Sequence, residues 1–185
     1  YRDQKLFYQQ YIPCLDPLDQ LRGERDYSLS VDIFSDFLKK LFDLWYEDLR
    51  NQQFVYNRYF ENLVGIIKGY QPESCGMQGR CTVQYVVEAD GSVYPCDFYV
   101  MDKYRIGNLL TDSFQDIDRK RKEIKFIEDS MMYHEDCKKC KWFFLCRGGC
   151  RRDCEKNSSG ELRKNYYCEA YKSFFAYAWD RLNSF

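Results

Sequence analysis

The sequence lacks the features of several familiar protein classes. No uncharged apolar run approaches the roughly 20 residues that a helix needs to cross a bilayer, which excludes a membrane-spanning protein. The net charge is only -1, so the strong positive charge expected of a nucleic-acid-binding protein is missing. The one basic run, residues 119–122, has acidic neighbours on both sides and is predicted to be the exposed face of a helix.

A secretion signal and an initiator methionine are also missing. Residues 1–11 have neither the apolar core nor the small-residue cleavage site of a signal peptide. The chain shows no internal repeat and no low-complexity tract. We therefore expect a cytoplasmic protein and a chain that is one part of a longer one.

Cysteine, by contrast, is abundant, with 10 residues among 185. Disulfide-dense chains are usually short secreted domains with thin cores, whereas this chain is long enough to bury a core without help. Metal binding by thiolates in a reducing cytosol therefore fits better. The 17 Tyr, 14 Phe and 3 Trp residues predict an aromatic core and could also line a groove for an extended peptide.

The first part of the chain predicts a strand, a loop and a helix. Residues 5–14 are rich in apolar and aromatic side chains and end at Pro13, which suits a short buried strand. From Ser30, a predicted N-cap, apolar residues recur at three- and four-residue steps and indicate a five-turn helix. A second, shorter helix should end near Gly69. Strand, loop and helix in this order resemble the last unit of a βα barrel.

The cysteine-rich part predicts a hairpin between helices. Residues 82–96 alternate in polarity around Asp90-Gly91, so Cys81 and Cys96 at the two ends should be close in space. Residues 106–109 predict a turn, and Ser113 should cap a helix that continues through Ile127. Cys168 begins a final aromatic helix.

A CxxC turn at Cys137 and Cys140 indicates a metal site, because the chain reverses within that spacing and presents both sulfurs to one centre. The spacing alone does not distinguish a zinc site from an iron-sulfur site. Disulfide bonds are a third, less favoured interpretation of these cysteines.

The longer pattern resembles a known family. Cys137-x2-Cys140-x5-Cys146-x3-Cys150, with the later Cys168, resembles the second half of the SPASM domain signature. The first half is present as Cys75 and Gly91-x4-Cys96, with an additional Cys81. SPASM domains extend radical S-adenosylmethionine (SAM) enzymes that modify peptides and proteins. Cys81, and Asp97 directly after the hairpin cysteine, make residues 71–171 most similar to the anaerobic sulfatase-maturating enzymes.

The resemblance implies an irregular α+β fold. Residues 1–55 would be the last strand and helix of a partial (β/α)6 radical SAM barrel, and residues 56–185 a SPASM domain. A β-hairpin, loops and helices would surround two auxiliary 4Fe-4S clusters, each held by four cysteines. The implied ligands are Cys75, Cys81, Cys96 and Cys150 for the first cluster, and Cys137, Cys140, Cys146 and Cys168 for the second. Folding should then depend on both clusters.

Two cysteines and the only histidine remain outside these sets. We expect Cys14 to be a small buried apolar residue, and Cys154 to be a bystander thiol, with a substitute ligand as the alternative. His134 is expected to be an ordinary hydrogen-bonded residue.

The activity implied by the resemblance is oxidation of a cysteine or serine in a sulfatase to Cα-formylglycine. The radical would come from a third 4Fe-4S cluster and SAM at a CxxxCxxC motif, which this sequence lacks, so this piece alone should not turn over. Asp97 is the predicted proton acceptor, the alternative being a turn aspartate that bonds nearby backbone N–H groups. Leu15 resembles a position that contacts the cofactor's adenine, the alternative being barrel packing.

The auxiliary clusters would accept the electron released in that oxidation, or would only shape the substrate groove. The implied partners are a sulfatase polypeptide or peptide substrate and an electron donor such as a flavodoxin or ferredoxin. Two other functions remain open at this point, namely a SPASM enzyme that forms thioether crosslinks and a zinc-binding interaction module.

Overall fold

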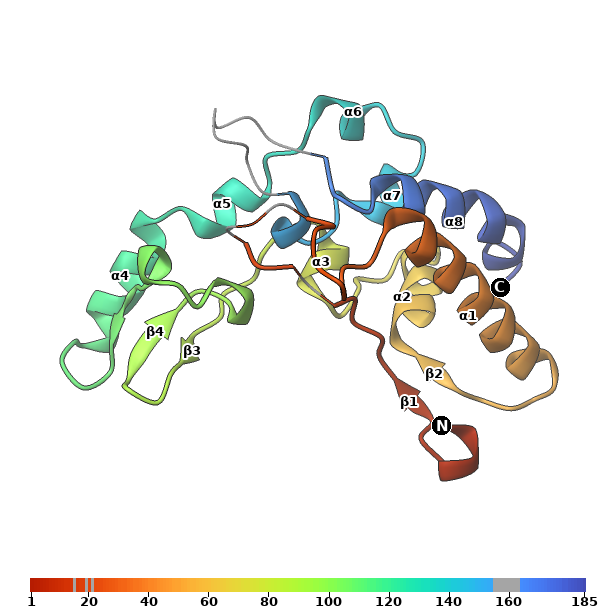
Figure 1. Ribbon diagram of the computed structural model, residues 1–185, viewed down its shortest axis with the longest axis horizontal. Helices are drawn as coiled ribbons and strands as arrows, with labels where there is room; N and C mark the ends of the chain where they lie inside the picture. The colour runs from red at the N-terminus through yellow and green to blue at the C-terminus, as the bar shows by residue number, and fades with distance from the viewer. Residues whose placement is uncertain (15, 19, 21, 155–163) are drawn as a thin grey trace.

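The computed structural model describes residues 1–14, 16–18, 20, 22–154 and 164–185. Two groups of elements flank a central stretch of short helices and loops (Figure 1). Long helices form one side, and a small sheet with helix α4 forms the other. The cysteine-rich segments lie between them, so both sides of the molecule contribute walls to this centre.

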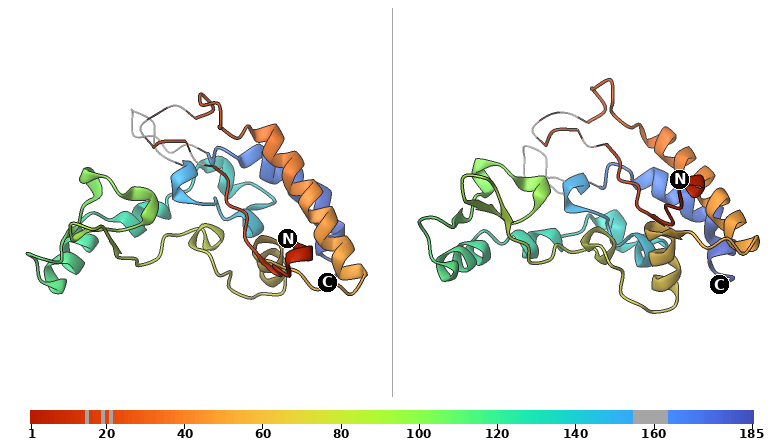
Figure 2. Two further views of the ribbon diagram at one scale, coloured as in Figure 1. Left: turned by 60° about the horizontal axis from the view of Figure 1, so that its bottom comes forward. Right: turned by 90° about the horizontal axis from the view of Figure 1, so that it is seen from below.

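Three helices form the larger side: α1 (Val31–Arg50), α2 (Arg58–Ile67) and α8 (Cys168–Leu182). Helices α1 and α8 lie side by side in every view (Figures 1 and 2). The predicted N-cap is confirmed, because the Ser30 hydroxyl accepts a hydrogen bond from the Ile33 N–H at 3.3 Å. The helices meet through aromatic rings, with the Phe42 ring 5.3 Å from that of Phe60 and 5.8 Å from that of Phe174. This aromatic core fixes the position of Cys168 at the start of α8.

The N-terminal segment departs from its prediction. It contains a 3-10 helix, η1 (Arg2–Gln4), and only a two-residue strand, β1 (Tyr8–Gln9), which pairs in parallel with β2 (Tyr56–Asn57). The expected buried strand is wrong in this structure, since Tyr8 is 63% exposed and Ile12 is 65% exposed. The physical reason is that a two-stranded ladder has two open faces, and within the described residues the main contact on Tyr8 is the stacked ring of Tyr56, 5.0 Å away.

The predicted hairpin is confirmed and is extended by a third strand. Strands β3 (Val86–Val87), β4 (Ser92–Tyr94) and β5 (Gly107–Asn108) form one antiparallel sheet in that order. Gly91 has φ +82°, as the hairpin turn requires. The predicted turn at 106–109 begins later than expected, at Leu109, because Gly107 and Asn108 pair with β4 and the Asn108 side chain donates to the Asp90 carbonyl at 2.9 Å.

Helix α4 (Phe114–Glu123) begins at the predicted cap, where the Ser113 hydroxyl accepts from the Asp116 N–H at 3.2 Å. The helix does not continue through Ile127, because Lys125 has φ +50° and a separate helix, α5 (Phe126–Ser130), follows. The basic run is neutralised as expected and is exposed except at Arg121, whose side chain is only 13% exposed. Asp118 pairs with Arg121 at 2.9 Å and with Lys122 at 2.7 Å.

Short elements carry the cysteines in the centre. They are α3 (Cys75–Gln78), η2 (Asp97–Tyr99), η3 (Asp102–Tyr104), α6 (Glu135–Lys138), α7 (Phe143–Cys146) and η4 (Arg151–Cys154). All except η3 contain or directly adjoin a cysteine. None of the described helices is both long and apolar enough to cross a membrane.

Candidate metal centres

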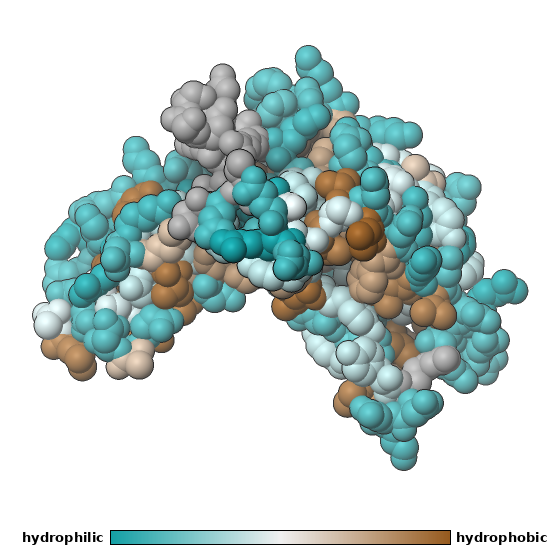
Figure 3. Space-filling view, in the orientation of Figure 1, coloured by the Kyte–Doolittle hydropathy of each residue, from teal (hydrophilic) through white to brown (hydrophobic). Residues whose placement is uncertain are grey.

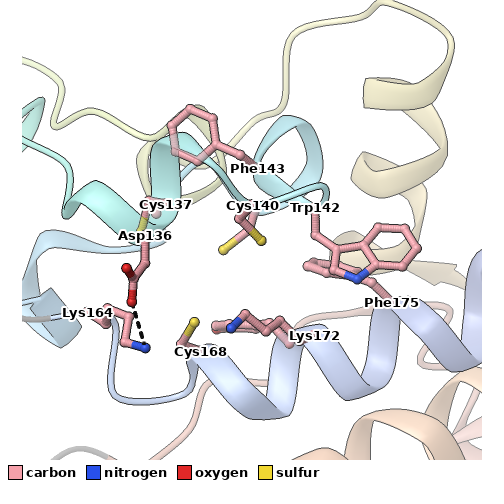
Figure 4. A pocket seen from close by; sticks show the side chains of 12 residues that line it. Asp136, Cys137, Cys140, Trp142, Phe143, Lys164, Cys168, Lys172 and Phe175 are labelled. Carbon is pink, nitrogen blue, oxygen red and sulfur yellow. Dashed lines mark ion pairs between the residues drawn. The ribbon is translucent and has the colours of Figure 1, made fainter.

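One cavity is lined by the four cysteines predicted for the second cluster: Cys137, Cys140, Cys146 and Cys168. They come from α6, from the turn that follows it, and from the facing ends of α7 and α8. Figure 4 shows Cys137, Cys140 and Cys168 around this space. The structure therefore brings together residues that are separated by up to 31 positions, 168 minus 137, in the sequence.

The cysteines predicted for the first cluster meet at a different place. Cys75, Cys81 and Cys150 line a second cavity beside Gly76 and Gly149. Cys96 belongs to the same neighbourhood, because the charges of Asp97 and Cys81 contribute to raising the pKa of its thiol, after the larger effect of burial. The predicted proximity of Cys81 and Cys96 across the hairpin is thus observed.

A glycine pair separates the two groups of cysteines. Gly148 and Gly149 have φ values of +84° and +75°, which non-glycine residues adopt only with strain. The turn that they form directs Cys146 to one cavity and Cys150 to the other. Because only three residues separate Cys146 from Cys150, the two candidate centres are close together along this segment of the chain.

The ten cysteines are free thiols in the structure, so the disulfide alternative has no support. In the described part of the chain, no three or more His, Cys, Asp or Glu side chains close around a single metal ion. The thiols instead border cavities. Burial raises the pKa of Cys146 and of Cys150 to about 12 each, so a buried thiolate at either place needs a positive centre beside it.

Backbone N–H groups donate hydrogen bonds to sulfur atoms in both groups of cysteines and stabilise negative charge there. The pKa of Cys146 is raised mainly by burial and lowered in part by a hydrogen bond from the Gly148 N–H. Cys150 receives the same kind of bond from Arg152, and Cys96 from Phe98. Such N–H···S bonds are a common way for proteins to hold and tune sulfur ligands. The donor set, the cavities and these bonds fit iron-sulfur centres.

Asp97 lies at the edge of the first group, directly beside Cys96. Its Oδ1 accepts hydrogen bonds from the Cys96 thiol at 3.2 Å and from the Phe98 N–H at 3.1 Å. The second bond is the one expected of a turn aspartate. The side chain is exposed, so its carboxylate remains accessible from the neighbouring space.

The remaining predicted residues do not line either cavity. The Cys154 thiol is half-buried and donates to the Gly148 carbonyl at 3.1 Å, which suits a bystander. Cys14 is exposed, so the expectation of a buried residue is wrong, because the N-terminal segment has little cover there. His134 caps α6 and accepts the Asp136 N–H at 3.1 Å, as expected of an ordinary polar residue.

Leu15 lies outside the described residues, but the loop that follows it is anchored near the first group. The Arg152 guanidinium, 6% exposed, donates to the Asp16 carbonyl, and Arg22 pairs with Asp153 at 3.0 Å. Burial raises the pKa of Asp153, and the charge of Arg22 works against that effect. These contacts tie Asp16 and Arg22 to η4, just after Cys150.

A groove runs from the first group along the N-terminal segment. It contains cavities of about 250 Å³ and 450 Å³, which share Tyr11, Pro13, Tyr59 and Tyr171. In Figure 3, apolar patches lie over the middle of the molecule and beside α1. The sequence did not single out Tyr59 and Tyr171. The only available signal was the high tyrosine content, which does not tell core tyrosines from groove tyrosines.

Comparison with known proteins agrees with this geometry. Residues 75–141 match the family model SPASM, described as an iron-sulfur cluster-binding domain. A cysteine-type anaerobic sulfatase-maturating enzyme of Clostridium perfringens (strain 13 / Type A) is 49% identical over 98% of this chain and 49% of its own length. A serine-type enzyme of Bacteroides thetaiotaomicron is 29% identical over 81% of this chain and 36% of its own.

Solved structures of the same family are also similar to this chain. The structure described as native anSMEcpe with bound AdoMet superposes with a TM-score of 0.92, at 48% identity, over 99% of this chain and 50% of that one. A second structure of that protein contains AdoMet and a Cp18Cys peptide and also has a TM-score of 0.92. This chain thus spans about half the length of the relatives it matches.

Proposed function

The chain is a close homologue of the anaerobic sulfatase-maturating enzymes over about half of their length, and we propose that it is the cluster-bearing C-terminal half of such an enzyme. The whole protein would oxidise an active-site cysteine or serine of a sulfatase to Cα-formylglycine. Within this half, residues 1–55 would complete a radical SAM barrel, and residues 56–185 would form the SPASM domain. A reducing cytoplasm would keep the cysteines available as ligands.

The observation that carries this proposal is the presence of two separate cavities lined by the expected cysteines. Cys137, Cys140, Cys146 and Cys168 would hold one 4Fe-4S cluster. Cys75, Cys81 and Cys150, joined by the adjacent Cys96, would hold the other. A four-iron cluster is larger than one metal ion, so its ligand sulfurs stand further apart than those of a zinc site.

When bound, such clusters supply sites that can accept an electron. The chain's own residues would hold and shield them, and Asp97 would take the proton that the substrate radical loses, from the sulfur of a cysteine or the oxygen of a serine. The thiol of Cys96 can donate to Asp97 only while it is protonated. Ligation removes that proton, which leaves Oδ1 bonded to Phe98 and free to accept again. Leu15 would contact the adenine of SAM in the complete enzyme.

The substrate would be a peptide or polypeptide segment of a sulfatase. The groove beside the first group of cysteines is lined by aromatic and apolar side chains and has room for an extended chain. The higher identity to cysteine-type than to serine-type enzymes, 49% against 29%, favours a cysteine target. A flavodoxin or ferredoxin would supply electrons for SAM cleavage.

The test is mass spectrometry of a sulfatase-motif peptide after anaerobic incubation with the full-length protein, SAM and a reductant. We expect the mass change of a thiol becoming an aldehyde. A crosslinked product would instead assign the protein to thioether formation. A colourless, folded protein without iron and sulfide would rule out the clusters and favour a zinc-binding interaction module.

A further inference from the structure

The two cysteine cavities differ in the charged side chains that border them. Lys164, Lys172 and Asp136 line the cavity of Cys137, Cys140, Cys146 and Cys168 (Figure 4). Lys172 is on α8, one turn after Cys168, so its position follows from the helix. The other cavity is lined by Arg80 and Arg151.

Lys172 brings a positive charge to this cavity that is only partly cancelled. It pairs with Glu169 at 2.9 Å, but the Glu169 side chain is 65% exposed and is not among the groups that line the cavity. The negative charges of Cys168 and Cys140 add to the effect of Glu169 in raising the pKa of Lys172, which places its ammonium within electrostatic range of both sulfurs.

Lys164 differs from Lys172 in the position of its partner. It pairs with Asp136 at 3.1 Å, and Asp136 lines the same cavity (Figure 4). The two opposite charges therefore act on the cavity together and largely cancel. Lys172 is left as the main source of positive potential among the described residues that line this space.

We propose that Lys172 raises the reduction potential of the second 4Fe-4S cluster by placing a positive charge, only partly cancelled by Glu169, beside two of its sulfur ligands. Reduction adds one negative charge to the cluster, and a nearby cation stabilises the reduced form more than the oxidised form. Lys172 thus acts as a tuning residue that makes this cluster easier to reduce. The inference rests on the proposed function, since it requires a cluster at these four cysteines.

The experiment is an anaerobic redox titration of the holoprotein, followed by electron paramagnetic resonance, with iron and sulfide measured for each variant. Lys172→Met should lower the equilibrium constant for one of the two reduction steps about tenfold, a shift of about 59 mV to more negative potential. Lys172→Arg should stay near the wild-type value, and the double variant Asp136→Asn/Lys164→Met, which removes a pair of opposite charges, should shift less than Lys172→Met. Lys40→Met removes the same charge from the exposed face of α1 and serves as the control.

Glu169→Gln provides a second test if Lys172→Met fails to assemble its cluster. It removes the exposed partner and leaves the lysine, so the same reduction step should shift to more positive potential. A Lys172→Met shift no larger than that of Lys40→Met, failure of Lys172→Arg to restore the potential, or an unchanged Glu169→Gln would each overturn the inference. Wild-type protein without a second cluster would instead contradict the proposed function.

Discussion

Cys146 and Cys150 flank a single glycine turn and line two different cavities. Because Cys146 ends α7 and Cys150 precedes η4, the same short segment forms a wall of both candidate centres. A disturbance of this turn should therefore affect both clusters. Under the proposed function, cluster ligation would join the hairpin, the central helices and α8 in addition to their packing.

Gly149→Ala should destabilise the protein strongly. Gly149 has φ +75°, and an added Cβ would collide with the Asn165 amide, which is held by the Gly148 carbonyl at 3.1 Å and the Tyr167 N–H at 2.8 Å. We expect a loss of about 3 kcal/mol in the free energy of unfolding, measured by denaturant titration of the holoprotein.

Gly69→Ala is the matched control for that change. Gly69 also has positive φ, at +85°, but a Cβ there meets no atom within 4 Å. It should cost only the backbone strain, about 1 kcal/mol. Equal losses of unfolding free energy in the two variants would show that the contact with Asn165 does not contribute to the destabilisation.

Cys150→Ser should remove one cluster's share of iron and sulfide, whereas Cys154→Ser should retain the full content. Cys150 lines the first cavity, while the Cys154 thiol bonds the Gly148 carbonyl and lines neither cavity. Iron and sulfide analysis of anaerobically purified protein checks this. The reverse result would make Cys154 the ligand and Cys150 the bystander.

Asp97→Asn should leave SAM cleavage intact in the full-length enzyme while formylglycine formation falls about 100-fold or more, as expected for loss of a general base. The amide keeps an oxygen for the Phe98 N–H but accepts no proton from substrate. Quantitative mass spectrometry of the two products provides the measurement. Asp102→Asn, an exposed change in the nearby η3, is the control, and normal product formation by Asp97→Asn would assign Asp97 to structure.

In the metal-free chain, Cys146 should react slowly with iodoacetamide at pH 8. Burial raises its pKa to about 12, and the thiolate is the reactive form. The rate should rise with pH until that value is reached, while the exposed Cys14 reacts quickly throughout. Peptide mass spectrometry gives both rates. Equal rates in a chain whose circular dichroism is native would contradict the burial of Cys146.

Cluster assembly should release protons for the same reason. Each ligand must lose its proton to bind iron, and the raised pKa of Cys146 and Cys150 keeps them protonated at neutral pH. The affinity of the protein for its clusters should therefore increase as the pH rises. Reconstitution followed by absorbance between pH 6.5 and 8.5 tests this, and a flat or falling yield would oppose it.

The sequence by itself determined the elements whose signals are local. Two helices begin at the predicted caps, Ser30 and Ser113, and follow the apolar spacing after each cap. The hairpin is present at the predicted Asp90-Gly91 turn. Cysteine spacing, together with the family resemblance, predicted two sets of four cysteines, and seven of these eight line the two cavities in the predicted grouping. The caps and the turn depend on neighbours in the chain, so a sequence can carry them, whereas the grouping of the cysteines came from the resemblance.

Strand pairing, exposure and the lining of the cavities depend on residues far apart in the sequence, and only the tertiary structure decided them. Strand β5 forms because β4 offers an open edge, and the exposure of Cys14 and Tyr8 reflects how little of the molecule covers the N-terminal segment. The position of Lys172 at one cavity and the groove around Tyr59 likewise result from helices that meet through aromatic packing. Burial and electrostatic neighbourhood are properties of the assembled fold, because they arise from residues far apart in sequence.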